Sequence, residues 1–400
     1  MKVAMVETGG WGGIAHYAWN LCQGLTRAGI EVVLYTNEVY ELAEMPRSFE
    51  LRRCLSGADR YPRAAARLRR AISDGAPHVL HLQSLLSTRF DGLLWSFLHR
   101  PWPIVFTIHN VRSHERSAWD DWTIWRLVRT ADALVVHTRE SAELVPSRVG
   151  PRPHVGVIPM GDLGFFAPTK KISREVARVR LGLPFDGPLL LAFGAIRPYK
   201  GLLGIIQAMS RVVARAPGVR LLIAGPLLAG TEAEYRRAIV DSGVGDRIVF
   251  RPTYVPHESV AAHFAASDIA VFNYREVTDS AAVRLPCSLG TPIVATNVGS
   301  FREFLHDGVT ARLVSPDDPP ALAGAILELL QNAGLASQLA ANARRLSQSA
   351  WSWDAIAAST IELYRRVVDP PEASAAETGL NHRPAGGRRR ATPDAGPGSA

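Results

Sequence analysis

The sequence is poor in cysteine and lacks long apolar runs. It has 3 cysteines in 400 residues, Cys22, Cys54 and Cys287, which lie far apart and form no C-x-x-C pair. This spacing excludes a disulfide framework and a zinc ribbon and favours a reducing cytosol. No apolar run approaches about 18 residues, so we expect no transmembrane helix. Residues 1–13 also lack the apolar stretch of a secretory signal peptide, so we expect a cytoplasmic protein.

The composition is globular, with an excess of positive charge. Hydrophobic residues make up 47% and charged residues 20% of the chain, which excludes a wholly disordered or collagen-like protein. The formal net charge is +8, and residues 46–73 carry eight arginines against Glu50 and Asp59. A solvated face is the simpler interpretation of this run. As a binding surface it suits an anionic lipid or the inner face of a membrane, since no nucleic-acid-binding motif is present.

Short apolar runs alternate with helical segments along the chain. In the first half we predict strands at residues 2–6, 30–36, 79–82, 104–108, 133–136 and 155–158. In the second half we predict strands at residues 188–193, 219–224, 248–250, 269–272 and 293–295. This alternation predicts an α/β protein with parallel sheets covered on both faces.

The alternation is interrupted once, at the charged segment 166–187, and we divide the chain there. We predict a first Rossmann-like lobe at 1–170 and a second at 171–350, with a ligand-binding cleft at the carboxyl ends of the strands. A helix at 351–368 follows. Residues 369–400 are rich in Pro, Gly, Ala, Ser and Arg, which predicts a disordered tail.

A glycine-rich loop, GGWGG at residues 9–13, follows the first predicted strand and precedes a helix. Gly12 and Gly13 let the backbone approach a ligand, and a helix start offers N–H groups to an anion. The spacing is not G-x-G-x-x-G, which disfavours a nicotinamide dehydrogenase. Trp11 and His16 beside the loop suit a sugar or lipid-linked acceptor. A tight turn without a ligand is the alternative.

Two further loops carry polar groups at the ends of strands in the second half. In GAIRPYKG at 194–201, Arg197 offers a fork and Lys200 a compact charge beside a helix start, which suits a diphosphate. Two surface cations on a loop are the alternative. After residues 269–272, Thr278 and Ser280 can cap the next helix or leave its N–H groups to a phosphate, and Asp279 can hold a sugar hydroxyl.

Two features have simpler structural interpretations. Trp119, Trp122 and Trp125 recur at every third position, which is typical of a packed helix face rather than a binding stripe. Glu303 follows the Val298–Gly299 turn, where a carboxylate stabilises a helix start.

Several stretches, taken in order, resemble family 4 glycosyltransferases of the GT-B fold. They are GGWGGIAHYAWNLCQGLTRAGIEVVLYT from residue 9, TIHN at 107–110, VIPMGD at 157–162, IRPYKG at 196–201, LLIAG at 221–225, GTPIVATNVGSFREFLHDGVTARLV at 290–314 and SWDAIAASTIELYRRV at 352–367. The resemblance implies that lobe one binds the acceptor, lobe two binds a nucleotide-diphosphate sugar, and the helix at 351–368 crosses back onto lobe one.

The resemblance also implies an activity. We expect a hexosyltransferase of polysaccharide biosynthesis that transfers a sugar to a carbohydrate, lipid-linked or small-molecule acceptor, with retention and with no metal ion or other cofactor. Cations and helix N-termini would stabilise the leaving diphosphate.

The resemblance assigns roles to individual residues. Lys200 matches the family's phosphate-binding lysine, and Gly194 begins the same loop. The usual arginine of that loop is replaced by Ala195, and we expect Arg197 to substitute for it. His109 matches a histidine near the reacting sugar. Gly12 and Gly13 match the lobe-one glycine loop.

The sequence departs from the family at two glutamates spaced eight positions apart. Counted back from Gly290, their positions hold Val277 and Leu285. Glu276, one place before Val277, is the remaining candidate for the first of them. The chain therefore resembles a divergent branch. Two alternatives stay open at this point: a sugar-nucleotide epimerase of the same fold, and a non-catalytic partner in polysaccharide assembly.

Overall fold

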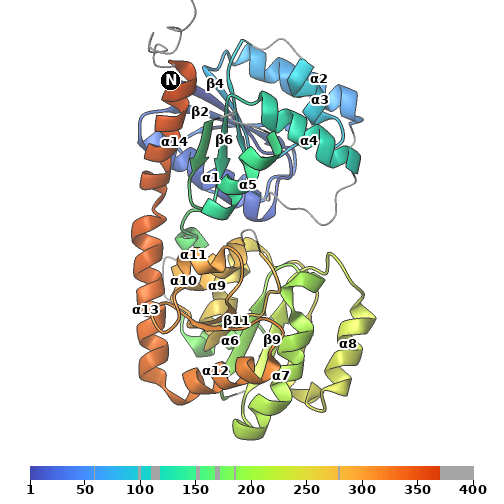
Figure 1. Cartoon of the computed structure of the whole chain (residues 1–400), viewed down its shortest axis with the longest axis vertical. Helices are drawn as coiled ribbons and strands as arrows, with labels where there is room; N and C mark the ends of the chain where they lie inside the picture. Colours follow the sequence, from blue (N-terminus) through green and yellow to red (C-terminus); the bar gives the residue numbers. More distant parts are fainter. Residues whose placement is uncertain are drawn as a thin grey trace, which may run out of the picture.

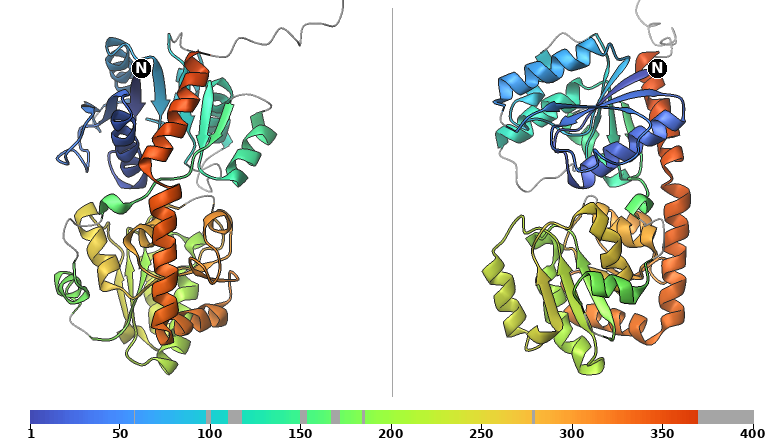
Figure 2. Two further views of the ribbon diagram at one scale, coloured as in Figure 1. Left: turned by 90° about the vertical axis from the view of Figure 1, so that its left-hand side faces the viewer. Right: turned by 180° about the vertical axis from the view of Figure 1, so that it is seen from behind.

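Two α/β lobes lie one above the other, and a long helical segment runs along one side of both (Figures 1 and 2). Each lobe is built on one parallel sheet. This confirms the two-lobed α/β class predicted from the sequence. The computed structural model describes residues 1–57, 59–97, 101–109, 118–149, 154–166, 172–183, 186–277 and 280–369.

Lobe one contains a seven-stranded parallel sheet with the order β3-β2-β1-β4-β5-β6-β7. Its strands are β1 (Lys2–Val6), β2 (Glu31–Asn37), β3 (Glu50–Leu55), β4 (Val79–Leu82), β5 (Ile104–Thr107), β6 (Ala133–Val136) and β7 (His154–Val157). Its helices are α1 (Gly12–Arg27), α2 (Tyr61–Asp74), α3 (Asp91–Phe97), α4 (Ala118–Thr130) and α5 (Arg139–Val149).

Both faces of this sheet are buried. Val3 and Met5 of β1 pack on one face with α1, whereas Ala4 and Val6 pack on the other with α2 and α4. Successive side chains of a strand point to opposite faces, so a doubly covered strand must be apolar throughout. This explains why the apolar runs located most strands correctly.

Lobe two contains a six-stranded parallel sheet with the order β10-β9-β8-β11-β12-β13. Its strands are β8 (Leu189–Phe193), β9 (Arg220–Ala224), β10 (Ile248–Arg251), β11 (Ile269–Phe272), β12 (Ile293–Thr296) and β13 (Arg312–Val314). Its helices are α6 (Arg174–Arg180), α7 (Leu202–Arg215), α8 (Glu232–Asp241), α9 (His257–Ala266), α10 (Ala281–Leu289), α11 (Phe301–Phe304), α12 (Pro319–Gln331) and α13 (Ala333–Ala350), with 3₁₀ turns η2 (Pro198–Lys200) and η3 (Gly245–Arg247).

The last helix, α14 (Trp353–Val368), follows α13 directly and packs against α1 of lobe one, whereas α13 packs against α10 of lobe two. The predicted crossing back onto lobe one is thus present (Figure 1). Tyr364 of α14 reaches the lobe-one sheet, with its hydroxyl 2.6 Å from Nδ1 of the buried His81. Among the helices of the described residues, none combines the length and the apolarity that a membrane span needs.

The linker between the lobes is tied to the junction of α13 and α14. It follows β7 and includes the 3₁₀ turn η1 (Gly164–Phe166). The Asp162 N–H donates to the Trp351 carbonyl at 2.8 Å, and the Trp353 indole donates to the Asp162 carbonyl at 2.7 Å. The two places where the chain passes between the lobes are therefore hydrogen-bonded to each other.

Two strands were not predicted. β3 lies inside the arginine-rich run, and β13 has only three residues, all partly buried. Both are edge strands and lack a continuous apolar run, so no sequence pattern marked them. The predicted lobe division at 170/171 and the predicted tail beyond Asp369 lie outside the described residues and stay predictions.

We predict that Gly24→Ala destabilises the protein by loosening the contact between α1 and α14. A Cβ at Gly24 would lie 2.7 Å from the Trp353 carbonyl oxygen and 3.3 Å from Ala357 Cβ. The obstacle is backbone, which cannot turn aside, so overpacking should cost about 1–3 kcal/mol. The melting temperature of the variant measures this loss.

Gly324→Ala in α12 is the matched control. Gly324 is an exposed helical glycine with no heavy atom within 4 Å of an added Cβ. Alanine there should stabilise the protein by about 0.5–1 kcal/mol. Equal shifts in melting temperature for the two variants would show that the crowding at Gly24 has no consequence.

Candidate functional site

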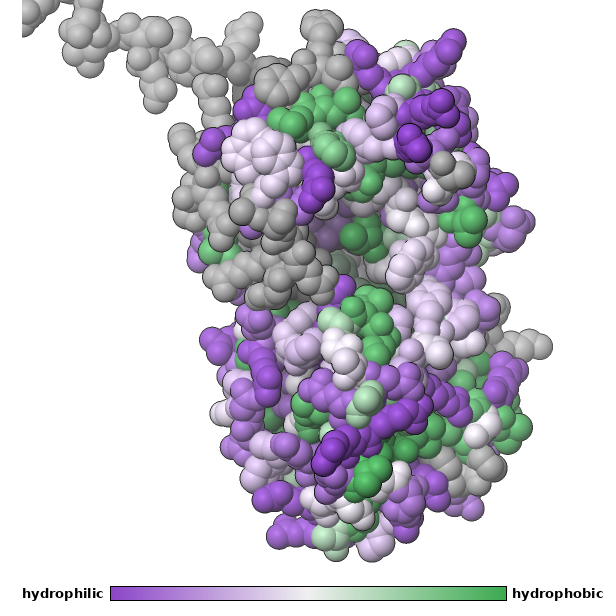
Figure 3. Space-filling view, turned by 90° about the vertical axis from the view of Figure 1, so that its right-hand side faces the viewer, coloured by the Kyte–Doolittle hydropathy of each residue, from purple (hydrophilic) through white to green (hydrophobic). Residues whose placement is uncertain are grey.

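A cavity lies between the lobes, at the carboxyl ends of both sheets. Its volume is about 610 Å³. Its lining comes largely from segments that follow strands in both lobes, including Glu7, Gly12 and Gly13 after β1, Ser84 after β4, Gly194, Arg197 and Lys200 after β8, and Tyr254 after β10. Figure 3 shows the surface hollowed where the two lobes meet. This confirms the predicted place of the cleft.

Arg197 and Lys200 line this cavity from the loop after β8. The loop is anchored to its neighbour, since the Ile196 N–H donates to the Pro226 carbonyl at 2.7 Å. Gly201 closes it with φ of 62°, and an added Cβ there would lie 1.9 Å from the Asn273 carbonyl oxygen. Only glycine fits this position. The tight turn at Gly201 lets the preceding residue, Lys200, line the cavity.

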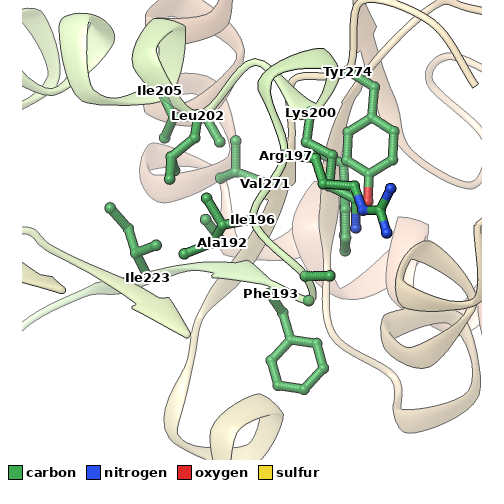
Figure 4. Close-up of a pocket in the computed structure, with 13 residues that line it drawn as sticks. Ala192, Phe193, Ile196, Arg197, Lys200, Leu202, Ile205, Ile223, Val271 and Tyr274 are labelled. Atoms are coloured by element: carbon green, nitrogen blue, oxygen red, sulfur yellow. The ribbon is translucent and has the colours of Figure 1, made fainter. Parts of the chain in front are cut away.

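The two cations share one environment. The Lys200 ammonium lies 5.2 Å from the centroid of the Tyr274 ring. Figure 4 shows the ends of Arg197 and Lys200 pointing to the same side, beside the Tyr274 hydroxyl. Burial lowers the pKa of Lys200 to about 8, and the charge of Arg197 acts in the same direction. Lys200 is therefore a desolvated cation, which gains from a nearby anion.

Two helix N-termini meet at the same cavity. Helix α10 begins after Ser280 and α1 begins at Gly12, and both starts line the cavity. A Cβ at Gly13 would lie 3.4 Å from Ala281 Cβ, so the two helix starts are in close proximity across the cleft. The positive ends of both helix dipoles therefore face the ligand space.

The predicted residues of the loop before α10 are only partly described. Ser280 is the N-cap residue of α10, but its side chain makes no cap hydrogen bond, and its hydroxyl lies 3.2 Å from the Tyr274 hydroxyl. Thr278 and Asp279 lie outside the described residues. Gly194 has φ of 104°, and an added Cβ would lie 3.0 Å from Ala282, so glycine lets α10 approach the cation loop.

The lobe-one glycine loop differs from the expectation. The N–H groups of Gly9 and Gly10 donate to the buried Glu7 carboxylate at 2.8 and 2.9 Å, and the Gly12 N–H donates to Glu41 at 3.1 Å. The sequence predicts that the start of this helix offers its N–H groups to an anion. In the structure the Gly12 N–H is bound by a carboxylate of the chain itself, so that expectation is wrong for Gly12.

Glu41, which no sequence pattern indicated, joins the two lobes. Its carboxylate lies 3.1 Å from His16 Nε2 and accepts from the Tyr254 hydroxyl at 2.7 Å and from the His257 N–H at 3.2 Å. His16 belongs to lobe one, whereas Tyr254 and His257 belong to lobe two. Burial alone would raise the pKa of Glu41, but the hydrogen bonds from His16 and Tyr254 outweigh it and lower the pKa to about 2.

His109 lies in a buried hydrogen-bond chain beneath the cleft. Its Nε2 is 3.1 Å from the Gln83 amide and its Nδ1 is 3.0 Å from His137 Nε2, while His137 Nδ1 is 2.9 Å from the Ile158 carbonyl. Burial and the neighbouring His137 lower the pKa of His109 well below its usual range. His109 is not among the described residues that line the cavity, so its role near the sugar stays a prediction.

The region where the family has paired glutamates is occupied differently. Glu276 is exposed and does not line the described cavity, whereas Leu285 lines it. Arg284 is 1% exposed, and its guanidinium stacks 4.5 Å from the Phe304 ring centroid and 4.4 Å from that of Trp351. This arginine supports the packing of lobe two and does not face the ligand space.

Glu303 lies near the contact between the two lobes. Glu303 stabilises a helix start, but that helix is α5 of the opposite lobe, since the carboxylate accepts from the N–H groups of Arg139 at 2.9 Å and Glu140 at 3.1 Å.

The prediction that Trp119, Trp122 and Trp125 form a packed face of α4 is wrong for two of the three. Trp119 is 49% and Trp122 50% exposed, because the helix turns them away from the sheet.

Over the described ranges, no group of three or more His, Cys, Asp or Glu side chains is arranged to hold a metal ion. The charged groups that the cavity presents are Arg197, Lys200 and the buried Glu7, whose pKa is raised by burial against the opposing N–H groups of Gly10 and Gly9.

Each lobe matches a glycosyltransferase family model. Residues 11–161 match the family model described as Glycosyltransferase Family 4, and residues 187–332 match the model described as Glycosyl transferases group 1. A D-inositol 3-phosphate glycosyltransferase of Xylanimonas cellulosilytica is 31% identical over 313 residues, which cover 73% of this chain and 72% of that protein. The protein of the same name from Thermomonospora curvata is 27% identical over 410 residues, covering 92% and 94%.

Solved structures share the fold. Sucrose-phosphate synthase from Thermosynechococcus elongatus superimposes with a TM-score of 0.72 at 23% identity, covering 91% of this chain and 98% of that one. Anabaena HepE in complex with UDP-glucose gives a TM-score of 0.72 at 19% identity, covering 91% and 99%. The chain belongs to glycosyltransferase family 4 and is a GT-B enzyme that transfers a sugar from a nucleotide-sugar donor.

Proposed function

We propose that the donor diphosphate binds where Arg197 and Lys200 meet the N-terminus of α10. The observation that carries this proposal is that two cations and the start of α10 face one cavity. Phosphate is favoured at helix N-termini and beside arginine and lysine. The cavity volume of about 610 Å³ lies within the range of small-molecule sites.

These groups act on the leaving diphosphate. Negative charge builds up on it as the bond between the sugar and the phosphate breaks, so charges fixed near it stabilise the transition state more than the bound donor. We propose that they do this without a metal ion or other cofactor. Family membership supports transfer with retention at the anomeric carbon.

We propose that the acceptor occupies the lobe-one side of the cavity, beside Trp11, Gly13 and His16. Trp11 is 55% exposed and lines the cavity, so its ring can stack on a sugar or polyol. The relatives named D-inositol 3-phosphate glycosyltransferases support a small polyol acceptor, and D-inositol 3-phosphate is the first acceptor to assay. The relatives give no support to an epimerase or to a non-catalytic partner.

We predict that Lys200→Ala lowers the turnover number by about 100-fold or more. Loss of one group that stabilises developing negative charge typically has an effect of this size. The measurement is release of nucleoside diphosphate from UDP-, GDP- and ADP-sugars with D-inositol 3-phosphate or water as acceptor. Each assay is run with EDTA and with Mg²⁺, and we expect equal rates in both.

Arg275→Ala is the control for this variant. Arg275 lies beside Tyr274 but its side chain pairs with Asp317 at 2.8 Å and does not line the described cavity. We expect near-wild-type turnover for it. Turnover of Lys200→Ala close to that of Arg275→Ala would contradict the phosphate role.

We predict that kcat/KM for the donor falls as the pH rises through about 8. The pKa of Lys200 is lowered to about 8, so the free enzyme carries this charge below that pH and loses it above. The pH profile of kcat/KM reports groups of the free enzyme. Lys200→Arg keeps its charge at high pH, so its profile should stay flat where the wild-type profile falls; a fall of the same size in both would assign the limb to another group.

We further propose that lobe one contacts an anionic membrane surface through α2 and its aromatic neighbours. Arg63, Arg67 and Arg70 of α2 are exposed, while Ala64 and Leu68 are buried in the core. Basic side chains beside exposed aromatic rings are typical of surfaces that bind anionic lipid.

The aromatic part of this surface is continuous with α2. The Tyr61 ring at the start of α2 lies 5.0 Å from the ring of Phe90, which is 45% exposed. The ring centroids of Trp119 and Trp122 lie 5.2 Å apart. The Trp119 indole N–H donates to the carbonyl of Arg89, which precedes Phe90 in the chain. Hydrophilic side chains gather along the upper right of the face shown in Figure 3.

We predict that the protein sediments with vesicles of phosphatidylcholine and phosphatidylglycerol and not with phosphatidylcholine alone. Arg63→Glu with Arg70→Glu should weaken this binding at least about tenfold, because each basic residue near the surface contributes about 1 kcal/mol. Arg211→Glu with Arg215→Glu on α7 of lobe two makes the same charge change and should bind like wild type. Equal losses for the two pairs would contradict the surface.

A further inference from the structure

The Glu41 carboxylate is a partly buried acceptor shared by both lobes. Its side chain is 12% exposed. One oxygen accepts from the Gly12 N–H at 3.1 Å and lies 3.1 Å from His16 Nε2. The other accepts from the His257 N–H at 3.2 Å, and the Tyr254 hydroxyl lies 2.7 Å from each. Four polar groups from two lobes therefore converge on one carboxylate at the edge of the cavity.

An ionised carboxylate can only accept hydrogen bonds. Three of the four groups at Glu41 are donors: the Gly12 N–H, the Tyr254 hydroxyl and the His257 N–H. They stabilise the carboxylate in its charged form. His16 Nε2 must then carry a proton to form its bond. In a neutral imidazole ring the second nitrogen, Nδ1, is left with its lone pair.

The ring of His16 is held by more than Glu41. Its centroid lies 5.6 Å from that of Phe165 and 4.9 Å from that of Phe166, both edge-on, in the linker between the lobes. Among the described residues none hydrogen-bonds to His16 Nδ1, and His16 lines the cavity on the side assigned to the acceptor. Nδ1 is thus the ring nitrogen that remains for a ligand.

We propose that Glu41 is a positioning residue that holds His16 as the Nε2–H tautomer, so that Nδ1 accepts a hydrogen bond from the acceptor hydroxyl. This inference rests on the proposed function, because it concerns the acceptor side of the same cavity. Tyr254 and His257 bring lobe two into the same cluster. The acceptor site is therefore completed by atoms of both lobes.

A purely structural Glu41 would cap α1 and join the lobes without acting through His16. The two roles differ in what they do to the histidine. A structural role predicts a loss of stability with an unchanged tautomer, whereas the positioning role predicts a changed tautomer. Glu41→Gln separates them, because its amide can donate to Nε2 and so favour the Nδ1–H form.

The first experiment needs no substrate. The full chain is labelled with ¹⁵N in its histidine rings, and His16 is assigned by comparison with His16→Gln. We expect the wild type to show the Nε2–H tautomer and Glu41→Gln to show a larger share of the Nδ1–H form. Glu44→Gln, the same change at an exposed residue three positions on, should leave the spectrum unchanged. A wild-type Nδ1–H tautomer, an imidazolium at pH 8, or a spectrum unaffected by Glu41→Gln would overturn the proposal.

The second experiment is a double-mutant cycle on transfer to D-inositol 3-phosphate, or on donor hydrolysis by water. Glu41→Gln should lower kcat/KM for the acceptor at least tenfold and leave donor KM within about twofold. In a His16→Ala background, Glu41→Gln should lower kcat/KM for the acceptor less than twofold, because an effect that acts through His16 is absent once His16 is removed. Additive losses in the two backgrounds would overturn the proposal.

The two levels of inference fail in different ways. If wild-type protein neither binds nor turns over any UDP-, GDP- or ADP-sugar, the proposed function fails, while the tautomer experiment still tests Glu41. If the wild type turns over a donor and the cycle is additive, the proposed function stands and the role of Glu41 fails.

Discussion

The site depends on one geometric constraint: the carboxyl ends of two parallel sheets face each other across a cleft. The cavity-lining loops follow strands of both sheets, and two of the helices that begin after such loops, α1 and α10, start at the cavity. The contact of α14 with α1 holds the lobes in this arrangement. Without it, Gly13 and Ala281 would not meet, and Lys200 would face solvent instead of lobe one.

The acidic residues around the cleft are engaged by donors of the chain itself. Glu7 accepts from the loop after β1, Glu41 from groups of both lobes, and Glu303 from the start of α5. Each carboxylate is thereby compensated locally, within the chain itself. The hydrogen bonds of Glu41 and Glu303 also join the two lobes, so the same carboxylates that are compensated locally contribute to the lobe contacts.

The sequence predicted what depends on local pattern and missed what depends on contacts between distant segments. The core strands were located because burial on both faces requires apolar runs, and the Gly194–Gly201 loop was found because its cations directly follow such a strand. β3 was missed because it is an edge strand among arginines. Glu41 and the bonds of His109 were missed because their partners lie on other strands or on the other lobe. The exposure of Trp119 and Trp122 could not be predicted from spacing, which does not say which face of a helix is covered.

The connection between the lobes has a mechanical consequence. The chain passes between them twice, once through the linker after β7 and once between α13 and α14, and hydrogen bonds of Asp162 with Trp351 and Trp353 join the two passages. If a single segment connected the lobes, one lobe could rotate relative to the other about that segment in any direction. Because the two passages are hydrogen-bonded to each other, they form one connection, and any change in the relative orientation of the lobes must be accommodated by both passages together. Gly161 lies in the linker beside this connection, and because a Cβ there would come within 2.3 Å of the Trp353 ring, a larger residue would push the two passages apart.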